Sequence, residues 1–270
     1  MSGIGGRFMV LLAAASAILA QSGDAPVKSP GAPDVLTIME SSIAATQRHW
    51  QTRLRYTWVE RDENRKRDPA GRVKSEEVDV TRTILVNGVP FEQLLERNGR
   101  PPEPWEARKQ KEKLDALNRE TPEQRARRTH EQEEDNASII REVPRAFDFE
   151  LVGEDLVKGR TAWILQATPR PGYQAQGKYG AMFSRVAGRL WVDKQDFGWI
   201  KVDGQVTQPF SIGLFLARVL PGSRIMMEQT RVDDGIWMPE RVEVRAAAKI
   251  FFIKSLVIEH VLSYSEYKRP

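Results

Sequence analysis

Residues 147–169 read FDFELVGEDLVKGRTAWILQATP, two alternating segments joined by a Lys158-Gly159 turn. Glycine reaches positive φ angles at little steric cost, so a tight glycine-containing turn between segments of period two is typical of a β-hairpin. The same pattern recurs at 189–207 and again at 224–246, where Asp234-Gly235 is the turn. Consecutive hairpins of this kind predict an antiparallel meander.

The strands of this meander are expected to have one apolar face and one polar face. Within 200–206 and 236–246 apolar residues alternate with charged ones, which predicts burial on one side only. The segment that starts near Ile250 is apolar on both faces, as in a central or covered strand. A sheet of this kind is curved around either a filled core or an apolar cavity, and the sequence leaves both open. The expected wall of such a cavity consists of Leu165, Val192, Val202, Val242 and Val244.

The first part of the chain predicts one helix followed by further strands. Asp34 is a suitable N-cap for a helix through about Arg53, and this helix either covers the core or acts as a lid over the open side of the sheet. Strands are expected at 55–60 and 73–86, and 89–97 is a strand or a short helix after the Asn87-Gly88 turn. The apolar face of the helix has residues three or four apart: Leu36, Met39, Ile43, Thr46, Trp50 and Leu54.

Residues 103–142 differ in composition from the strands around them. Large apolar residues are few, helix-forming charged residues dominate, and Thr121-Pro122 provides a cap and a proline at the first helical position. We therefore predict two polar helices, the second starting near Pro122, inserted between two parts of the sheet. The insertion is either a solvated covering of the sheet or a hairpin that docks on a protein partner.

The N-terminus resembles an export signal. Arg7 precedes the apolar run 8–19, which is shorter than the roughly 20 residues that a membrane-spanning helix requires. An uncleaved anchor or a buried helix is the alternative. The expected organisation is a signal peptide at 1–20, a flexible lead at 21–33 and a single domain at 34–270. Cysteine is absent, so there is neither a disulfide nor a lipid-acceptor cysteine, and a soluble protein of the bacterial periplasm is expected.

Charge and motifs disfavour several classes of function. The 41 basic and 37 acidic residues are interleaved, and no basic stripe alternates with aromatic residues, so no nucleic-acid partner is expected. His49, His130 and His260 lie far apart and match no metal-binding spacing. The chain has neither a nucleophile elbow nor a phosphate-binding glycine loop. We therefore expect no catalytic residue, no metal and no cofactor, although a triad assembled from distant residues stays open.

The carboxyl half is similar to a known family. The order Gly159-Arg160-x-x-Trp163-x-Leu165, then Gly188-x-Leu190-Trp191-Val192-Asp193 and a returning Ile200-Lys201-Val202 resembles the periplasmic lipoprotein-sorting carriers, the LolA/LolB-like family. Residues 233–239 look like the late hairpin of that family. The resemblance covers 147–267 well and 34–97 loosely. It implies an unclosed antiparallel barrel of roughly eleven strands, with helices over its open side and an apolar cavity that carries acyl chains or lipids. The insertion at 103–142 departs from the family pattern.

From these observations we expect an α+β fold, a highly curved antiparallel sheet (an unclosed β-barrel) with helices on its concave side and a polar helical insertion. The expected function is non-catalytic periplasmic binding of a lipid or an acylated ligand. An envelope interaction or sensor module, which would present the insertion at 103–142 to an envelope protein, is the alternative. A hydrolase that depends on His49 or His260 is the third hypothesis.

Overall fold

The computed structural model describes residues 33–174, 180–212, 217–233, 235–250 and 254–270, so the expected signal peptide and lead lie outside the described residues. The chain forms helices and strands in the order α1 (Val35–Arg53), β1 (Thr57–Arg67), β2 (Val73–Val86), β3 (Val89–Arg97), α2 (Pro104–Asn118), α3 (Pro122–Ala146), β4 (Phe147–Val157), β5 (Arg160–Pro169), α4 (Gly180–Phe183), β6 (Val186–Asp193), β7 (Trp199–Val206), β8 (Phe210–Ile212), β9 (Ala217–Val219), β10 (Arg224–Arg231), β11 (Trp237–Ile250) and β12 (Lys254–Lys268).

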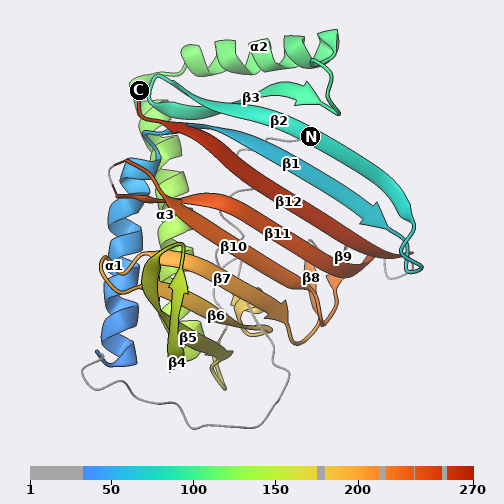
Figure 1. The fold of residues 1–270 in the computed structure, drawn as a ribbon. Coiled ribbons are helices and arrows are strands. Elements are labelled where there is room, and N and C mark those ends of the chain that lie inside the picture. The colour runs from blue at the N-terminus through green and yellow to red at the C-terminus, as the bar shows by residue number, and fades with distance from the viewer. Residues whose placement is uncertain (1–32, 175–179, 213–216, 234, 251–253) are drawn as a thin grey trace.

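One large antiparallel sheet contains all the strands (Figure 1). Its strand order is β3-β2-β1-β12-β11-β10-β7-β6-β5-β4, and β8 and β9 form a small extension beside β11. Strands β3 and β4 are the two edges and do not pair with each other, so the sheet stays open. The predicted α+β fold with an unclosed, curved antiparallel sheet is therefore confirmed.

The hairpins form where the turn chemistry predicts them. Asn87 and Gly88 have φ angles of 52° and 80°, and Lys158 and Gly159 have φ angles of 52° and 76°. Two successive positive φ angles define the turn whose twist matches that of antiparallel strands. The segment after Asn87-Gly88 is a strand, β3, and not a short helix.

The first helix packs against the sheet much as its sequence predicts. The backbone N–H of Thr37 donates to Asp34 Oδ1 at 2.9 Å, which confirms Asp34 as the cap. Ile38 and Met39 are buried in the main core. Leu36, however, was expected on the apolar face and is 65% exposed, because the buried stripe of the helix runs through Ile38 and not through its first turn.

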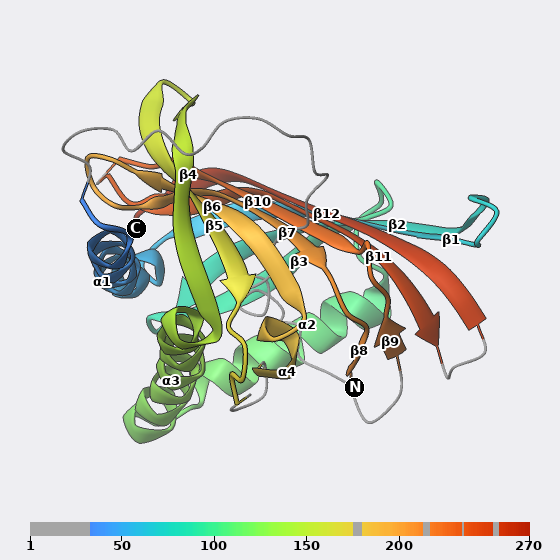
Figure 2. The same ribbon diagram turned by 90° about the horizontal axis from the view of Figure 1, so that it is seen from below.

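The two helices of the insertion join opposite edges of the sheet. Strand β3 precedes α2 and strand β4 follows α3, so the chain passes from one edge to the other along the same side of the sheet (Figure 2). Thr121 caps α3, since its side chain accepts from Gln124 N at 3.3 Å. The prediction of two polar helices is confirmed, but α3 is longer than expected and buries Val143 and Ala146 in the core.

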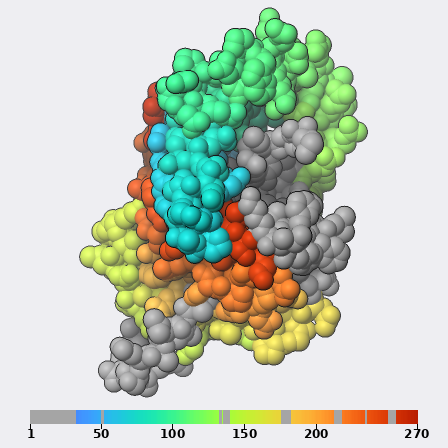
Figure 3. All heavy atoms as spheres, turned by 90° about the vertical axis from the view of Figure 1, so that its right-hand side faces the viewer, coloured from blue at the N-terminus to red at the C-terminus, as the bar shows by residue number. Residues whose placement is uncertain are grey.

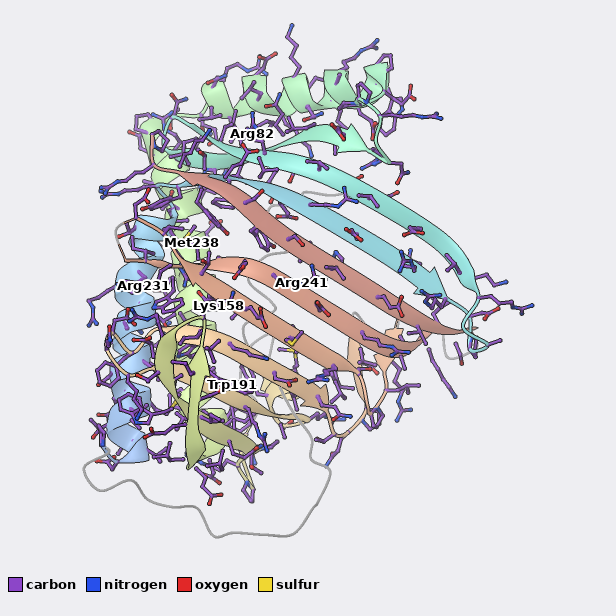
Figure 4. All side chains as sticks on the ribbon, viewed as in Figure 1. Arg82, Lys158, Trp191, Arg231, Met238 and Arg241 are labelled. Carbon is purple, nitrogen blue, oxygen red and sulfur yellow. The ribbon has the colours of Figure 1, made fainter. Side chains whose placement is uncertain are left out.

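The two faces of the sheet have different chemistry. We call the side against which α1, α3 and α4 pack the concave face, because core residues from these helices and from the inner side of the strands form one cluster. The convex face carries charged side chains, among them Arg82 and Arg241 (Figure 4), which pair with Glu266 and Glu243. Among the described residues, no helix is long and apolar enough to cross a membrane.

Candidate functional site

The predicted cavity-wall residues share the concave face. Leu165, Val192, Val202 and Val242 belong to the main core cluster and are at most 7% exposed, and half-buried Val244 packs against the same cluster. The structure therefore brings all five residues together on one face. Four of them are in contact with a core that includes side chains of α1, α3 and α4, whereas Val244 lies at the margin of this filled part.

A less covered apolar strip continues from Val244 along β11 and β12. Val242 pairs with Leu262, and the next residues on the same face are Val244 on β11 and Ala246, which pairs with Ile258 on β12. Val244, Ala246 and Ile258 are all half-buried, whereas Val242 and Leu262 are buried. We name Val244, Ala246 and Ile258 the apolar strip. The strip lies between the buried pair of Val242 and Leu262 and Ala248, the next residue of β11 on this face, which is buried again.

A row of polar side chains lies on the concave face of β1 and β12, and its Asn64–His260 end adjoins this strip. Glu60 pairs with Tyr264, Asp62 with Leu262 and Asn64 with His260, so the even-numbered residues of β1 face the same side as the core residue Leu262. We name Glu60, Asp62, Asn64 and His260 the polar row. Asn64 Oδ1 is inaccessible to solvent and has no hydrogen-bond partner among the described residues, and the same holds for Nε1 of Trp58 at the end of this row.

Glu60 is the buried acid of the polar row. Glu60 is only 9% exposed to solvent. Burial, with smaller contributions from the neighbouring carboxylates of Glu92 and Asp62, raises the pKa of Glu60 to about 8. Near neutral pH the group is therefore a neutral carboxylic acid that can both donate and accept a hydrogen bond.

Replacing Glu60 with glutamine is expected to flatten the pH dependence of stability. Because the pKa of Glu60 is raised on folding, the folded state binds more protons between about pH 4.5 and pH 8. Its stabilising effect is complete below the unfolded pKa and is lost as the pH rises through the folded pKa. We expect the wild type to lose roughly 4 kcal/mol of unfolding free energy through this group across that range, and Glu60→Gln to lose none of it.

Urea unfolding of the two proteins at pH 5 and pH 8.5 measures this difference. Glu63→Gln is the matched control, since Glu63 lies on the same strand with its side chain on the opposite, more exposed face. An unchanged pH slope in Glu60→Gln, or the same change of slope in both variants, would contradict the assignment.

His260 is held by a carboxylate from a strand far away in the sequence. Its Nε2 lies 2.6 Å from Asp62 Oδ1, and both side chains are about one-fifth exposed. A histidine paired with a carboxylate is part of the arrangement that activates a nucleophile, but the contacts described for His260 include neither a hydroxyl nor a thiol. Within the described residues no cluster of three or more metal-ligating side chains is found.

Reasoning from sequence missed the polar row. His260 appeared isolated because its partner lies 198 residues away. The strand expected at 55–60 ended before Asp62 and Asn64, whereas β1 extends from Thr57 to Arg67. The pairing of β1 with β12 places alternate residues of this longer strand on the concave face. The only signal that pointed toward it was the apolar character of both faces of the last strand, which indicated a central position in the sheet.

Comparisons with known proteins gave structural likenesses alone. No family model and no curated protein sequence matched the chain. A LolA superfamily protein from Nitrosomonas europaea is 11% identical, with coverage of 88% of this chain and 94% of that one and a TM-score of 0.32. An outer-membrane lipoprotein-sorting protein domain from Vibrio parahaemolyticus is 12% identical (85% and 92% covered, TM-score 0.35), and a DUF1329 family protein from Desulfovibrio piger is 11% identical (86% and 93% covered, TM-score 0.32).

The chain forms a twelve-stranded antiparallel sheet whose two edge strands do not pair with each other and whose concave side is packed against helices. The unclosed antiparallel sheet with helices on one side, which the resemblance of residues 147–267 to the lipoprotein-sorting carriers implied, is present in this chain.

Proposed function

We propose that the protein binds an amphipathic ligand, a lipid or an acylated molecule, on the concave face of its sheet in the bacterial periplasm, without catalysis. The observation that supports this most is the apolar strip of Val244, Ala246 and Ile258, which is less covered than the adjoining core and meets the Asn64–His260 end of the polar row. Ligand sites are mostly apolar with a few polar groups that fix orientation.

The two parts of the site suit the two parts of such a ligand. An acyl chain would lie along the apolar strip, where each methylene removed from water contributes about 0.8 kcal/mol. The polar end would meet Asn64 Oδ1, a buried acceptor without a partner among the described residues, and Glu60 lies further along the same row, beyond Asp62. A buried acceptor of this kind is costly unless a ligand or water donates to it.

The remaining predicted wall residues would form the inner end of the site. Leu165, Val192, Val202 and Val242 are covered by the core cluster that includes Ile38 and Met39 of α1. A chain long enough to reach them would have to displace α1, which then acts as a lid. A shorter chain would occupy the apolar strip with α1 in place.

Native mass spectrometry of protein purified from bacterial envelopes tests this function. We expect an adduct with the mass of a lipid that organic solvent releases, and binding of a fluorescent fatty acid to the delipidated protein that this lipid displaces. Protein that carries no adduct and binds neither the fatty acid nor a lysophospholipid at micromolar concentration would rule the proposal out.

A further inference from the structure

Helix α2 has one side fixed to the sheet by polar contacts. Glu106 is buried and pairs with Arg97 Nη1 at 2.5 Å, and Arg97 also pairs with Asp79 at 2.7 Å. The backbone N–H of Leu94 donates to Gln110 Oε1 at 2.7 Å. The less exposed residues of this helix are 106, 110, 114, 115 and 117. The spacing of 106, 110, 114 and 117 places these four on the side that faces β3.

The opposite side of α2 is exposed, basic and carries a tryptophan. Trp105 is 60% exposed, the most exposed aromatic side chain among the described residues. Between residues 100 and 119 two acidic residues are exposed, Glu103 and Glu112, whereas six basic residues are exposed. None of these six forms an ion pair within the described part of the chain. These cations are Arg100, Arg108, Lys109, Lys111, Lys113 and Arg119.

The position of α2 leaves this side accessible to a flat surface. Figure 1 and Figure 3 both show α2 at one extremity of the molecule, beyond the edge strand β3. A broad, planar partner can therefore meet the whole length of the helix without first touching the rest of the protein. A partner that bound α2 in a concave pocket would not require the helix to lie at an extremity of the molecule.

The side chains present are those that favour a lipid–water interface. A tryptophan ring has an apolar body and a polar N–H, and it is stable where one end is apolar and the other wet. Lysine and arginine extend their charged groups toward phosphate while their stems cover apolar surface. Each basic residue close to an anionic surface raises the affinity of the protein for that surface by about a factor of five.

We propose that the outward face of α2, formed by Trp105, Arg108, Lys109 and Lys111, docks on the surface of an anionic phospholipid bilayer. The helix lies on the bilayer and does not cross it. This docking stands independently of ligand binding on the concave face, because the two surfaces share no residue. If both exist, docking brings the open side of the sheet close to a source or a destination of lipid.

Vesicle cosedimentation of the purified protein tests the docking. We expect binding to phosphatidylcholine vesicles that contain phosphatidylglycerol, weak binding to pure phosphatidylcholine, and release at high salt. The triple variant Arg108→Glu, Lys109→Glu, Lys111→Glu should bind roughly 100-fold more weakly, since three favourable charges are lost. Trp105→Ala should weaken binding with no change in salt dependence.

A second triple variant separates local docking from general charge. Arg55→Glu, Arg218→Glu, Lys249→Glu makes the same change in net charge at exposed positions away from α2 and should retain most of the binding. Equal losses in both triple variants, or wild-type binding in the α2 triple variant, would overturn the proposal. It is also overturned if the α2 variants lose an acidic protein partner while vesicle binding is unchanged. Binding of the fluorescent fatty acid should stay at the wild-type level in every variant. A result that overturns bilayer docking is therefore distinct from one that overturns ligand binding on the concave face.

Discussion

Asp193→Ala is expected to cost about 3–5 kcal/mol of unfolding free energy, the largest loss of stability that we predict for a polar residue here. Asp193 is fully buried. Its Oδ1 accepts from Arg160 Nη2 at 2.7 Å and from the backbone N–H groups of Gln195 and Asp196 at 2.8 and 3.0 Å. The variant leaves the two backbone donors without this acceptor, and the mostly buried Arg160 guanidinium keeps only the longer bond to Asp196 Oδ2 at 3.3 Å.

Urea unfolding at neutral pH measures the loss, and acid pH gives an independent check. Burial opposes ionisation of Asp193, but the hydrogen bonds from Arg160 and the two backbone amides prevail and hold its pKa below its ordinary value of 3.8. Its stabilising effect is therefore present above about pH 3.8 and is lost as the pH falls through the folded pKa. Asp193→Asn should lack this part of the acid sensitivity.

Asp203→Ala is the matched control for this prediction. Asp203 accepts a hydrogen bond from Arg224 Nε at 2.8 Å, but this pair lies on the exposed side of the sheet, with the Arg224 side chain 59% exposed. Exposed pairs of this kind contribute about 1 kcal/mol or less. Equal losses in the two variants would show that burial of Asp193 is not the cause.

Ala246→Phe is expected to weaken acyl-chain binding by roughly tenfold or more while the fold stays intact. Ala246 is half-buried on the concave face and pairs with Ile258. A phenyl ring at this position occupies the space along the apolar strip, and displacing two or more methylenes of the ligand costs about 0.8 kcal/mol each. Titration with a fluorescent fatty acid measures the change.

The neighbouring position provides the control. Ala247 is also half-buried, but it follows Ala246 on the same strand and its side chain lies on the convex face. Ala247→Phe should therefore bind the fatty acid like the wild type. Wild-type binding by Ala246→Phe, with a melting temperature that shows it to be folded, would place the ligand elsewhere.

Several features of this protein follow from short stretches of its sequence. The Lys158-Gly159 and Asn87-Gly88 turns specify their hairpins because the required positive φ angles depend on the two residues themselves. Asp34 and Thr121 start their helices because each side chain accepts from a backbone N–H of its own first turn. Alternation of apolar and polar residues within β11 likewise gave the correct buried face.

Tertiary structure alone decided how these units are assembled and where the candidate site lies. Strand β1 pairs with β12, which brings Asp62 to His260 and buries Glu60. No local signal specifies this pairing, since it closes a loop of about two hundred residues and depends on the whole core for its stability. Tertiary packing also decides three other features. They are the raised pKa of Glu60, the exposure of Leu36 and the passage of α2 and α3 between the two edges of the sheet. Turns and helix caps are determined by a few neighbouring residues. Strand pairing and side-chain burial are determined by apolar surfaces far apart in the sequence that are removed from water when they pack together.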